Sequence, residues 1–421
     1  MLSEIGTQWS SYSRSMILCT WIFNCLILLT NEYYRGYDWS AILNNGWTPY
    51  PDWLEACAKW LERHRGLTSW YGLFNLVVLR MISFNIDRIW AKEGRPIVER
   101  DGNVLTFHKH TIKCTECRQV SNGLQRSSTG GSRPSSSSAT YVPCPWWREK
   151  EHHSELEYNF ITYFVYLFYL PLHFAGPTIT FNSFLSHIKL PQQTYSNRGL
   201  AKYFLIKTVF IFLLLEWWLH YLYVFSFTNS STFRSLSPYA MAMTSYYTLV
   251  GIWLKFTAIW RYFRCWALFD GVEPPENMQR CVSNNYSIQA FWRAWHRSFN
   301  RWLIRYIYVP LGGASSTTLS SSSSPSLQSR LFNICRQSLN IFLTFSFVAF
   351  WHDRTLQLLT WGWLIALLFI PELTAQAVFN MKSLRWIKKK WYWRHVQGVG
   401  AAISIFYMMA SKHNSGKAHR S

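Results

Sequence analysis

Charged residues are scarce in this sequence. Asp, Glu, Lys and Arg together make up 15% of 421 residues, against about 25% in an average soluble domain. The few charges gather in short stretches between long apolar runs, and residues 158–188 contain none of them. This distribution argues against a soluble domain with a solvated surface.

The sequence also lacks a cysteine framework and the short motifs of several enzyme classes. Its nine cysteines are scattered and odd in number, which argues against a disulfide scaffold. No G-x-S-x-G elbow, P-loop, dinucleotide fingerprint or H-E-x-x-H pair occurs. Enzymes built on these motifs are therefore excluded.

Aromatic and basic residues are in excess. The 24 Trp, 24 Tyr and 29 Phe amount to 18% of the chain, and Trp and Tyr favour membrane–water interfaces. The net charge is +21, but Lys and Arg lie between uncharged segments, where they can face anionic lipid headgroups. We therefore expect a membrane as partner and no binding of nucleic acid.

Eight apolar runs predict membrane spans, because a helix of about 20 residues crosses the hydrocarbon core. They are 15–31, 66–90, 158–176, 203–227, 236–260, 331–352, 355–376 and 396–411. The first run has no clear cleavage site after it, so we expect it to be a retained span.

Some of these runs contain charges or helix-breaking residues. Four charges lie inside spans, and we expect neighbouring helices to shield them. They are Arg80, Lys207, Glu216 and Lys255. Pro171, Gly176 and Pro177 interrupt the third run and predict a broken or re-entrant helix pair.

Two Ser-rich segments, 119–145 and 314–328, have too little apolar content to fold. We predict them to be disordered inserts in a single multi-pass domain, 1–421, that ends in a basic tail, 412–421.

Residues 286–311 predict an amphipathic helix with an arginine stripe. Apolar and aromatic residues recur there at three- and four-residue spacing, beside Arg293, Arg297, Arg301 and Arg305. Two interpretations stay open. The helix could lie on anionic lipid, or its guanidinium groups could bind a phosphate-bearing ligand.

Two histidines follow tryptophans at the edges of apolar sequence, His296 in "WRAWHRSFNRW" and His352 in "FVAFWHDR". A single such histidine is typically structural or interfacial, but two in matching contexts favour a function. A neutral imidazole in a dry site can act as a general base. Asp353 is a poor partner for His352, because adjacent helical residues point in different directions, and we expect it to pair with Arg354 or another neighbour.

A second cluster, His108, His110, Cys114 and Cys117, lies in "TFHKHTIKCTEC". Four such side chains could coordinate zinc in a tetrahedron. However, the H-x-H spacing so near the cysteines fits no familiar zinc module, and the segment leads directly into an insert. We therefore predict no metal site and no cofactor.

Three blocks, 158–184, 261–313 and 347–353, together resemble the membrane-bound O-acyltransferase superfamily. The most specific parts are the run W-H-R-S-F-N-R-W-x-x-R-Y-x-Y-x-P-L-G-G, 295–313, and the later W-H pair. The nearest branch is that of the glycerol-uptake proteins, whose members remodel glycosylphosphatidylinositol (GPI) anchors. It neighbours the Hedgehog acyltransferase branch.

The resemblance implies an all-α, polytopic transmembrane bundle around a tunnel, in the endoplasmic reticulum membrane. It implies an O-acyltransferase that moves a long-chain acyl group from acyl-CoA, the co-substrate, to a hydroxyl, with sn-2 of a lyso-GPI lipid as the acceptor. His352 takes the place of the catalytic histidine, and His296 that of its earlier partner. The substrate-binding residues would be Trp295, Arg297, Asn300, Arg301, Arg305 and Trp351.

Three alternatives remain. A protein palmitoyltransferase of the Hedgehog acyltransferase type would use the same chemistry on another acceptor. A glycerol or solute transport protein is disfavoured, because only one Pro/Gly-broken segment is visible and transporters commonly have paired ones. A catalytically silent scaffold is disfavoured by the presence of both histidines.

Overall fold

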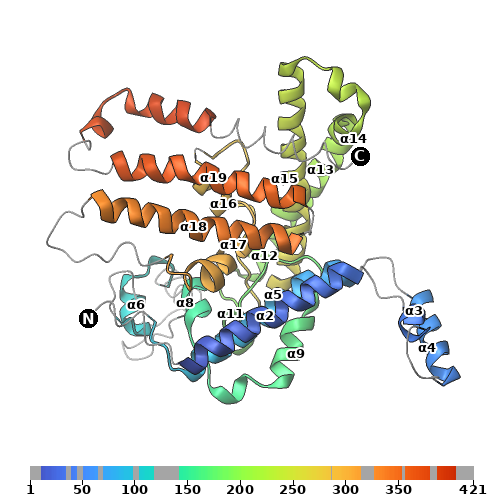
Figure 1. The fold of residues 1–421 in the computed structure, drawn as a ribbon. Coiled ribbons are helices and arrows are strands. Elements are labelled where there is room, and N and C mark those ends of the chain that lie inside the picture. The colour runs from blue at the N-terminus through green and yellow to red at the C-terminus, as the bar shows by residue number, and fades with distance from the viewer. Residues whose placement is uncertain are drawn as a thin grey trace.

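The computed structural model describes most of the chain, and there its regular elements are helices. The described residues are 11–34, 39–44, 51–64, 70–97, 104–117, 142–285, 287–313, 327–352, 356–379 and 386–403. The architecture is an all-helical membrane bundle, as predicted (Figure 1).

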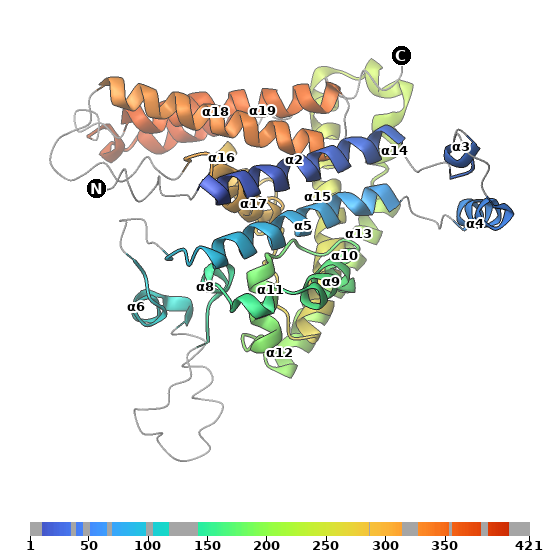
Figure 2. The same ribbon diagram turned by 60° about the horizontal axis from the view of Figure 1, so that its bottom comes forward.

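Two helices from the N-terminal part run side by side along the bundle, α2 (Ser11–Tyr34) and α5 (Trp70–Lys92) (Figures 1 and 2). Neither is interrupted by proline, and α2 contains a 20-residue apolar stretch, Tyr12–Asn31, long enough to cross a membrane. Two short helices that lie between α2 and α5 in sequence, α3 (Trp39–Asn44) and α4 (Asp52–Arg63), are placed away from the bundle at one end of this pair (Figure 1).

A second antiparallel pair, α18 (Leu327–His352) and α19 (Leu356–Phe379), forms the layer on the other side of α2 (Figure 2). Both helices contain stretches long and apolar enough to span a membrane. Gly362 lets them approach closely, because a Cβ there would lie 3.1 Å from the carbonyl oxygen of Phe345. Trp363 Nε1 also donates a hydrogen bond to Ser346 Oγ at 3.0 Å.

The remaining predicted spans differ from simple apolar crossings. The run 236–260 is part of the 32-residue helix α15 (Pro238–Phe269), which crosses the two pairs (Figure 1). The run 203–227 is divided into the π-helix η2 (Tyr203–Val209), α13 (Phe210–Tyr221) and α14 (Val224–Asn229). The last run, 396–411, is described only as far as residue 403, where it is helical.

The predicted shielding of internal charges is confirmed for one of the four. Arg80 is 4% exposed, and its Nη1 donates to the carbonyl oxygens of Tyr166 and Leu167 at 3.2 and 2.8 Å. Lys207, Glu216 and Lys255 are exposed, so the expectation was wrong for them. Apolar side chains beside them, such as Leu205 and Leu213, are exposed as well, so these charges lie on the outer side of the bundle.

The predicted break in the third run is confirmed. Its helical parts are α9 (Phe160–Phe168), α10 (Leu170–His173) and, after an extended turn, α11 (Phe181–Lys189). Gly176 is required in this turn, because a Cβ there would lie 2.4 Å from the carbonyl oxygen of Pro171.

Shorter elements complete the bundle. They are α6 (Phe107–Lys113), α8 (Pro145–Lys150), η1 (Glu155–Glu157), α12 (Asn197–Lys202), η3 (Ser231–Ser235), α16 (Ile288–Ala294), α17 (Arg297–Leu303), η4 (Ile304–Tyr308) and η5 (Ile387–Lys389). Helix α17 and η4 lie between the α2–α5 pair and α18, where Trp302 and Tyr306 are each 1% exposed.

The predicted inserts fall mostly outside the described residues, as does the tail 412–421. The structure describes the chain again from Val142, and Val142 and Cys144 are 4% and 3% exposed. The last four residues of the predicted insert 119–145 therefore belong to the packed protein.

Candidate active site

The predicted continuous helix over 286–311 is wrong, because the chain breaks at Trp295 and His296 between α16 and α17. His296 has φ 46° and ψ 50°, a left-handed conformation. Among the described residues it is the only non-glycine with positive φ. Such a backbone costs about 1–3 kcal/mol and persists where surrounding contacts enforce it, commonly at functional sites.

Asn277 enforces this break from the loop before α16. Its carbonyl oxygen accepts from the main-chain N–H of Arg297 at 3.1 Å, and its side-chain oxygen accepts from that of Ser298 at 2.9 Å. Asn277 is 1% exposed. It thus satisfies the first N–H groups of α17 and fixes the residue before them. The sequence offered no local signal for this role.

Aromatic rings hold the His296 side chain in place. The imidazole stacks on Trp260 of α15, with ring centroids 4.4 Å apart and planes 24° apart. The ring of Phe299 also contacts the imidazole, with a centroid distance of 5.1 Å. The predicted neighbour Trp295 stacks instead on Phe291 at 5.6 Å. The side chain of His296 is therefore oriented by packing against rings from two elements.

His352 lies at the end of α18, directly after the buried Trp351. Trp351 Nε1 donates to the carbonyl oxygen of Asn75 at 2.7 Å, and Asn75 Nδ2 donates to that of Trp351 at 2.9 Å. This pair fixes the last turn of α18 against α5. The His352 side chain itself is exposed and thus accessible. Asp353 and Arg354 lie outside the described residues.

The structure brings the two predicted histidines together. A chain of ring contacts joins them. Phe299 touches His296, and Trp351 lies 4.6 Å from Phe299 and 4.6 Å from His352. Within the described residues, no side-chain hydrogen bond reaches either imidazole. Both remain able to donate or accept a proton toward a substrate.

The predicted arginine stripe is divided among different environments. Arg293 is exposed, and Arg301 pairs with Glu149 of α8 at 2.8 Å. Burial, followed by repulsion from Arg301, lowers the pKa of the Arg297 guanidinium from its ordinary value. Arg297 and Arg301 therefore form a basic pair beside the His296 break, with Glu149 nearby.

Arg305 is in a different position, because it makes an internal ion pair. Its Nη2 lies 2.7 Å from Oδ1 of Asp87, a residue of α5 that is 0% exposed. The guanidinium also lies over the rings of Trp90 and Tyr306, at 4.9 and 5.4 Å. This geometry argues against the predicted role of Arg305 in substrate binding, because its charge is already compensated inside the bundle.

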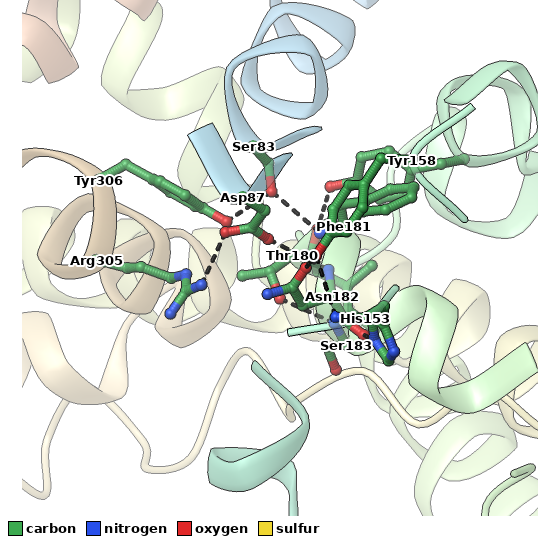
Figure 3. Close-up of polar contacts among 12 residues, drawn as sticks. Ser83, Asp87, His153, Tyr158, Thr180, Phe181, Asn182, Ser183, Arg305 and Tyr306 are labelled. Atoms are coloured by element: carbon green, nitrogen blue, oxygen red, sulfur yellow. Dashed lines mark hydrogen bonds and ion pairs between the residues drawn. The ribbon is translucent and has the colours of Figure 1, made fainter. Parts of the chain in front are cut away.

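The Asp87–Arg305 pair belongs to a buried polar network that joins α5, α11 and η4 (Figure 3). Asp87 Oδ2 accepts from the main-chain N–H of Asn182 at 3.2 Å. Ser83 and Tyr306 hydroxyls lie 2.7 Å apart, and Ser83 Oγ accepts from the N–H of Phe181 at 3.1 Å. The network anchors α11 and η4 to α5. Only one of its members, Arg305, was identified from the sequence.

The last predicted site residue, Asn300, is half-buried in α17, and its main-chain N–H donates to the carbonyl oxygen of His296 at 3.0 Å. The site thus consists of the exposed His352, the half-buried His296, aromatic packing around them and a nearby basic pair. Together with the bundle, it defines a polytopic membrane protein with a histidine-based site between its helices.

A family comparison agrees with this class. The profile of MBOAT, the membrane-bound O-acyltransferase family, matches residues 53–414, which include both histidines. The chain belongs to this family.

Individual relatives of this chain are also named membrane-bound O-acyltransferases. The "Membrane-bound O-acyltransferase gup1" of Schizosaccharomyces pombe is 35% identical over 396 residues, which cover 93% of this chain and 56% of that protein. The "Membrane-bound O-acyltransferase GUP2" of Saccharomyces cerevisiae is 37% identical over 346 residues, or 81% of this chain and 50% of that protein. This chain therefore spans about half the length of these relatives.

A more distant relative comes from the neighbouring branch. The "Protein-cysteine N-palmitoyltransferase HHAT" of Mus musculus is 25% identical over 203 residues, which cover 47% of this chain and 37% of that protein.

Proposed function

We propose that this chain is an O-acyltransferase that moves a long-chain acyl group from acyl-CoA to a hydroxyl acceptor in the membrane. The observation that carries the proposal is the chain of ring contacts, through Phe299 and Trp351, that links His296 in its left-handed backbone to the accessible His352. Acyl transfer to a hydroxyl needs a proton acceptor for the nucleophile and a donor for the developing oxyanion. Two adjacent imidazoles can supply both.

In this mechanism, His352 takes the proton from the acceptor hydroxyl as its oxygen attacks the thioester carbonyl. His296, in its neutral form, donates a hydrogen bond to the carbonyl oxygen. The CoA thiolate leaves and takes that proton from His352, which returns the imidazole to its neutral form. Because the acceptor attacks the thioester directly, no covalent enzyme intermediate forms. The packing of His296 on Trp260 and the Asn75–Trp351 pair keep both groups oriented before substrate binds.

Arg297 and Arg301 are the candidates for the phosphates of acyl-CoA. They lie in the first turns of α17, directly after His296. A phosphate would compensate their mutual repulsion, and guanidinium groups bind phosphate through paired hydrogen bonds. Trp295 and Asn300, the other predicted contacts, flank the same break.

For the acceptor, we propose the sn-2 hydroxyl of a lyso-GPI lipid in the endoplasmic reticulum membrane. The support is the motif resemblance and the higher identity to proteins named O-acyltransferases than to the protein-cysteine N-palmitoyltransferase. The absence of a second broken segment no longer argues against transport, because α16 and α17 are also interrupted. Family membership is the stronger ground for an acyltransferase.

The test measures transfer from radiolabelled acyl-CoA to lipid in membranes that contain the full chain. His352→Ala should lower the rate about 10²–10⁴-fold, the usual contribution of a general base. His220→Ala is the matched control, since His220 is exposed on α13 and distant in sequence. Acyl transfer that persisted in His352→Ala would refute the mechanism. Solute flux across the membrane that persisted in the same variant would favour a transporter.

The acceptor is tested separately by lipidomics of cells with and without the chain. Accumulation of lyso-GPI in its absence is the expected result. Normal GPI lipids together with loss of acyl groups from a secreted protein would instead identify a protein acyltransferase.

A further inference from the structure

Four potential metal ligands meet at the opposite end of α8 from the active site. They are His110, Cys114, Cys117 and Cys144, whose ligand atoms all lie within 4.8 Å of one another. His110 Nε2 lies 3.2 Å from Cys144 Sγ, and Cys117 and Cys144 are 0% and 3% exposed. None of the nine cysteines, all of which lie within the described residues, forms a disulfide.

The sequence builds this cluster from two separated segments. Thr106 caps α6 by accepting from the N–H of Lys109 at 3.4 Å, and α6 then carries His110. Cys114 ends α6, with its N–H donating to the carbonyl oxygen of His110 at 2.8 Å. After residues 118–141, Cys144 precedes α8, where Pro145 starts the helix.

The fourth group is thus Cys144, which the local sequence pattern had not suggested. The side chain of His108, the earlier candidate, is exposed. Its carbonyl oxygen accepts a hydrogen bond from Thr111 Oγ1 at 2.8 Å. His110 is instead enclosed by two rings, with Trp146 and Trp147 stacked at 5.1 and 5.3 Å. These rings fix the imidazole with one nitrogen toward Cys144.

We propose that His110, Cys114, Cys117 and Cys144 bind one zinc ion. Three thiolates and one imidazole are a usual ligand set for tetrahedral Zn²⁺. With Zn–S bonds of about 2.3 Å, the sulfurs of such a tetrahedron lie about 3.8 Å apart, which is compatible with ligand atoms that all lie within 4.8 Å of one another. Binding releases the thiol protons, and the four protein ligands leave no position for water, so the site is structural and not catalytic.

The position of the site gives it a consequence for α8. The ion would join α6 to the first residue before α8, across the segment 118–141. From α8, Arg148 donates to the carbonyl oxygens of Ser186 and Leu190 at 2.9 Å each, and Glu149 pairs with Arg301. The zinc site therefore holds the helix that contacts both α11 and the basic pair beside His296.

The test is elemental analysis of the full-length chain purified in detergent, without added metal. About one zinc per chain is expected in the wild type. Cys117→Ser and Cys144→Ser should each lower zinc content at least about tenfold. His108→Ala and Cys57→Ser, at exposed positions, are the matched controls and should keep it. Equal zinc in all variants, no metal, or iron instead of zinc would overturn the proposal.

A second measurement uses only the wild type, in case the variants do not fold. A thiol-alkylating reagent should modify the exposed Cys57, which lies outside the apolar spans, at once. Cys117 and Cys144 should become reactive only after a zinc chelator is added. Reactivity that required a reductant, and not the chelator, would identify a disulfide and overturn the zinc site. Neither readout depends on acyl transfer, so the zinc site and the proposed function can fail separately.

Discussion

Asn75 and Trp351 exchange two hydrogen bonds between α5 and the end of α18, although they are 276 residues apart. The contact uses both main-chain carbonyl groups, so it fixes the backbone as well as the two side chains. His352 is the next residue. The position of the proposed general base therefore depends on a residue far from it in sequence.

Asn75→Ala should lower the rate constant kcat more than it changes KM for acyl-CoA. The substitution removes the partner of the Trp351 carbonyl, which costs about 1 kcal/mol of stability. A shift of His352 by a fraction of an ångström should cost about ten- to a hundredfold in kcat. Acyl transfer kinetics in membranes measure both constants, and thermal unfolding in detergent measures the stability.

Asn75→Gln and Trp351→Phe complete that comparison. Trp351→Phe removes the other hydrogen bond and should reproduce the loss of kcat, while it keeps most of the ring contact with Phe299. A rise in KM with unchanged kcat in all three variants would show that this contact serves binding and does not position His352.

Sequence patterns predicted α18 and its histidine well, because residues 338–352 contain no Asp, Glu, Lys or Arg and end in a Trp-His pair. They did not predict the break at His296, since the helical spacing of apolar residues runs on through it. Tertiary contacts override that local pattern, through Asn277 before α16 and Trp260 of α15. A residue held from outside its own helix leaves no local signal.

Tertiary contacts also explain why the predicted arginine stripe does not act as one surface. Four arginines at four-residue spacing follow one side of a helical wheel, turned by about 40° from one to the next, but the structure gives them different partners. Arg305 meets Asp87 of α5 and Arg301 meets Glu149 of α8. Which arginine is compensated depends on long-range packing, and a single sequence contains no record of it.

Comparison of His296→Gly with His296→Ala should separate the contribution of the imidazole to acyl transfer from the effect of the left-handed backbone on stability. Both substitutions remove the ring and its stack on Trp260. Only alanine must place a Cβ in the left-handed region, so the glycine variant should be more stable by about 1 kcal/mol. Both should lose about 10²-fold or more in acyl transfer, as expected for removal of an oxyanion donor.

Thermal unfolding in detergent and transfer rates in membranes check these two expectations. Equal stability of the two variants would contradict the left-handed backbone. A glycine variant with the full wild-type rate would assign His296 a structural role only.

The ion pair between Asp87 and Arg305 should be far more important for stability than for substrate binding. Arg305→Met leaves the Asp87 carboxylate buried without its partner, at a cost of about 3–5 kcal/mol. Adding Asp87→Asn should recover part of this loss, because no uncompensated charge then remains. Retention of the folded chain on size-exclusion chromatography, as a function of temperature, measures the difference.

The control for that pair is Arg198→Met on α12, where the side chain is exposed and little change is expected. The opposite result is an Arg305→Met variant that keeps wild-type stability but has a much higher KM for acyl-CoA. It would show that Arg305 binds substrate.

Arg301 and Glu149 distinguish a phosphate site from a purely structural ion pair. If Arg301 binds acyl-CoA phosphate, Arg301→Gln should raise KM about tenfold, since a hydrogen bond to a charged group contributes about 1.5–3 kcal/mol. Glu149→Gln should then lower KM, because it removes the carboxylate that competes with the phosphate for Arg301. Initial rates across a range of acyl-CoA concentrations measure both effects, with Arg198→Gln as the control. If both substitutions reduced stability equally and left KM unchanged, the pair would serve only to join α8 to α17.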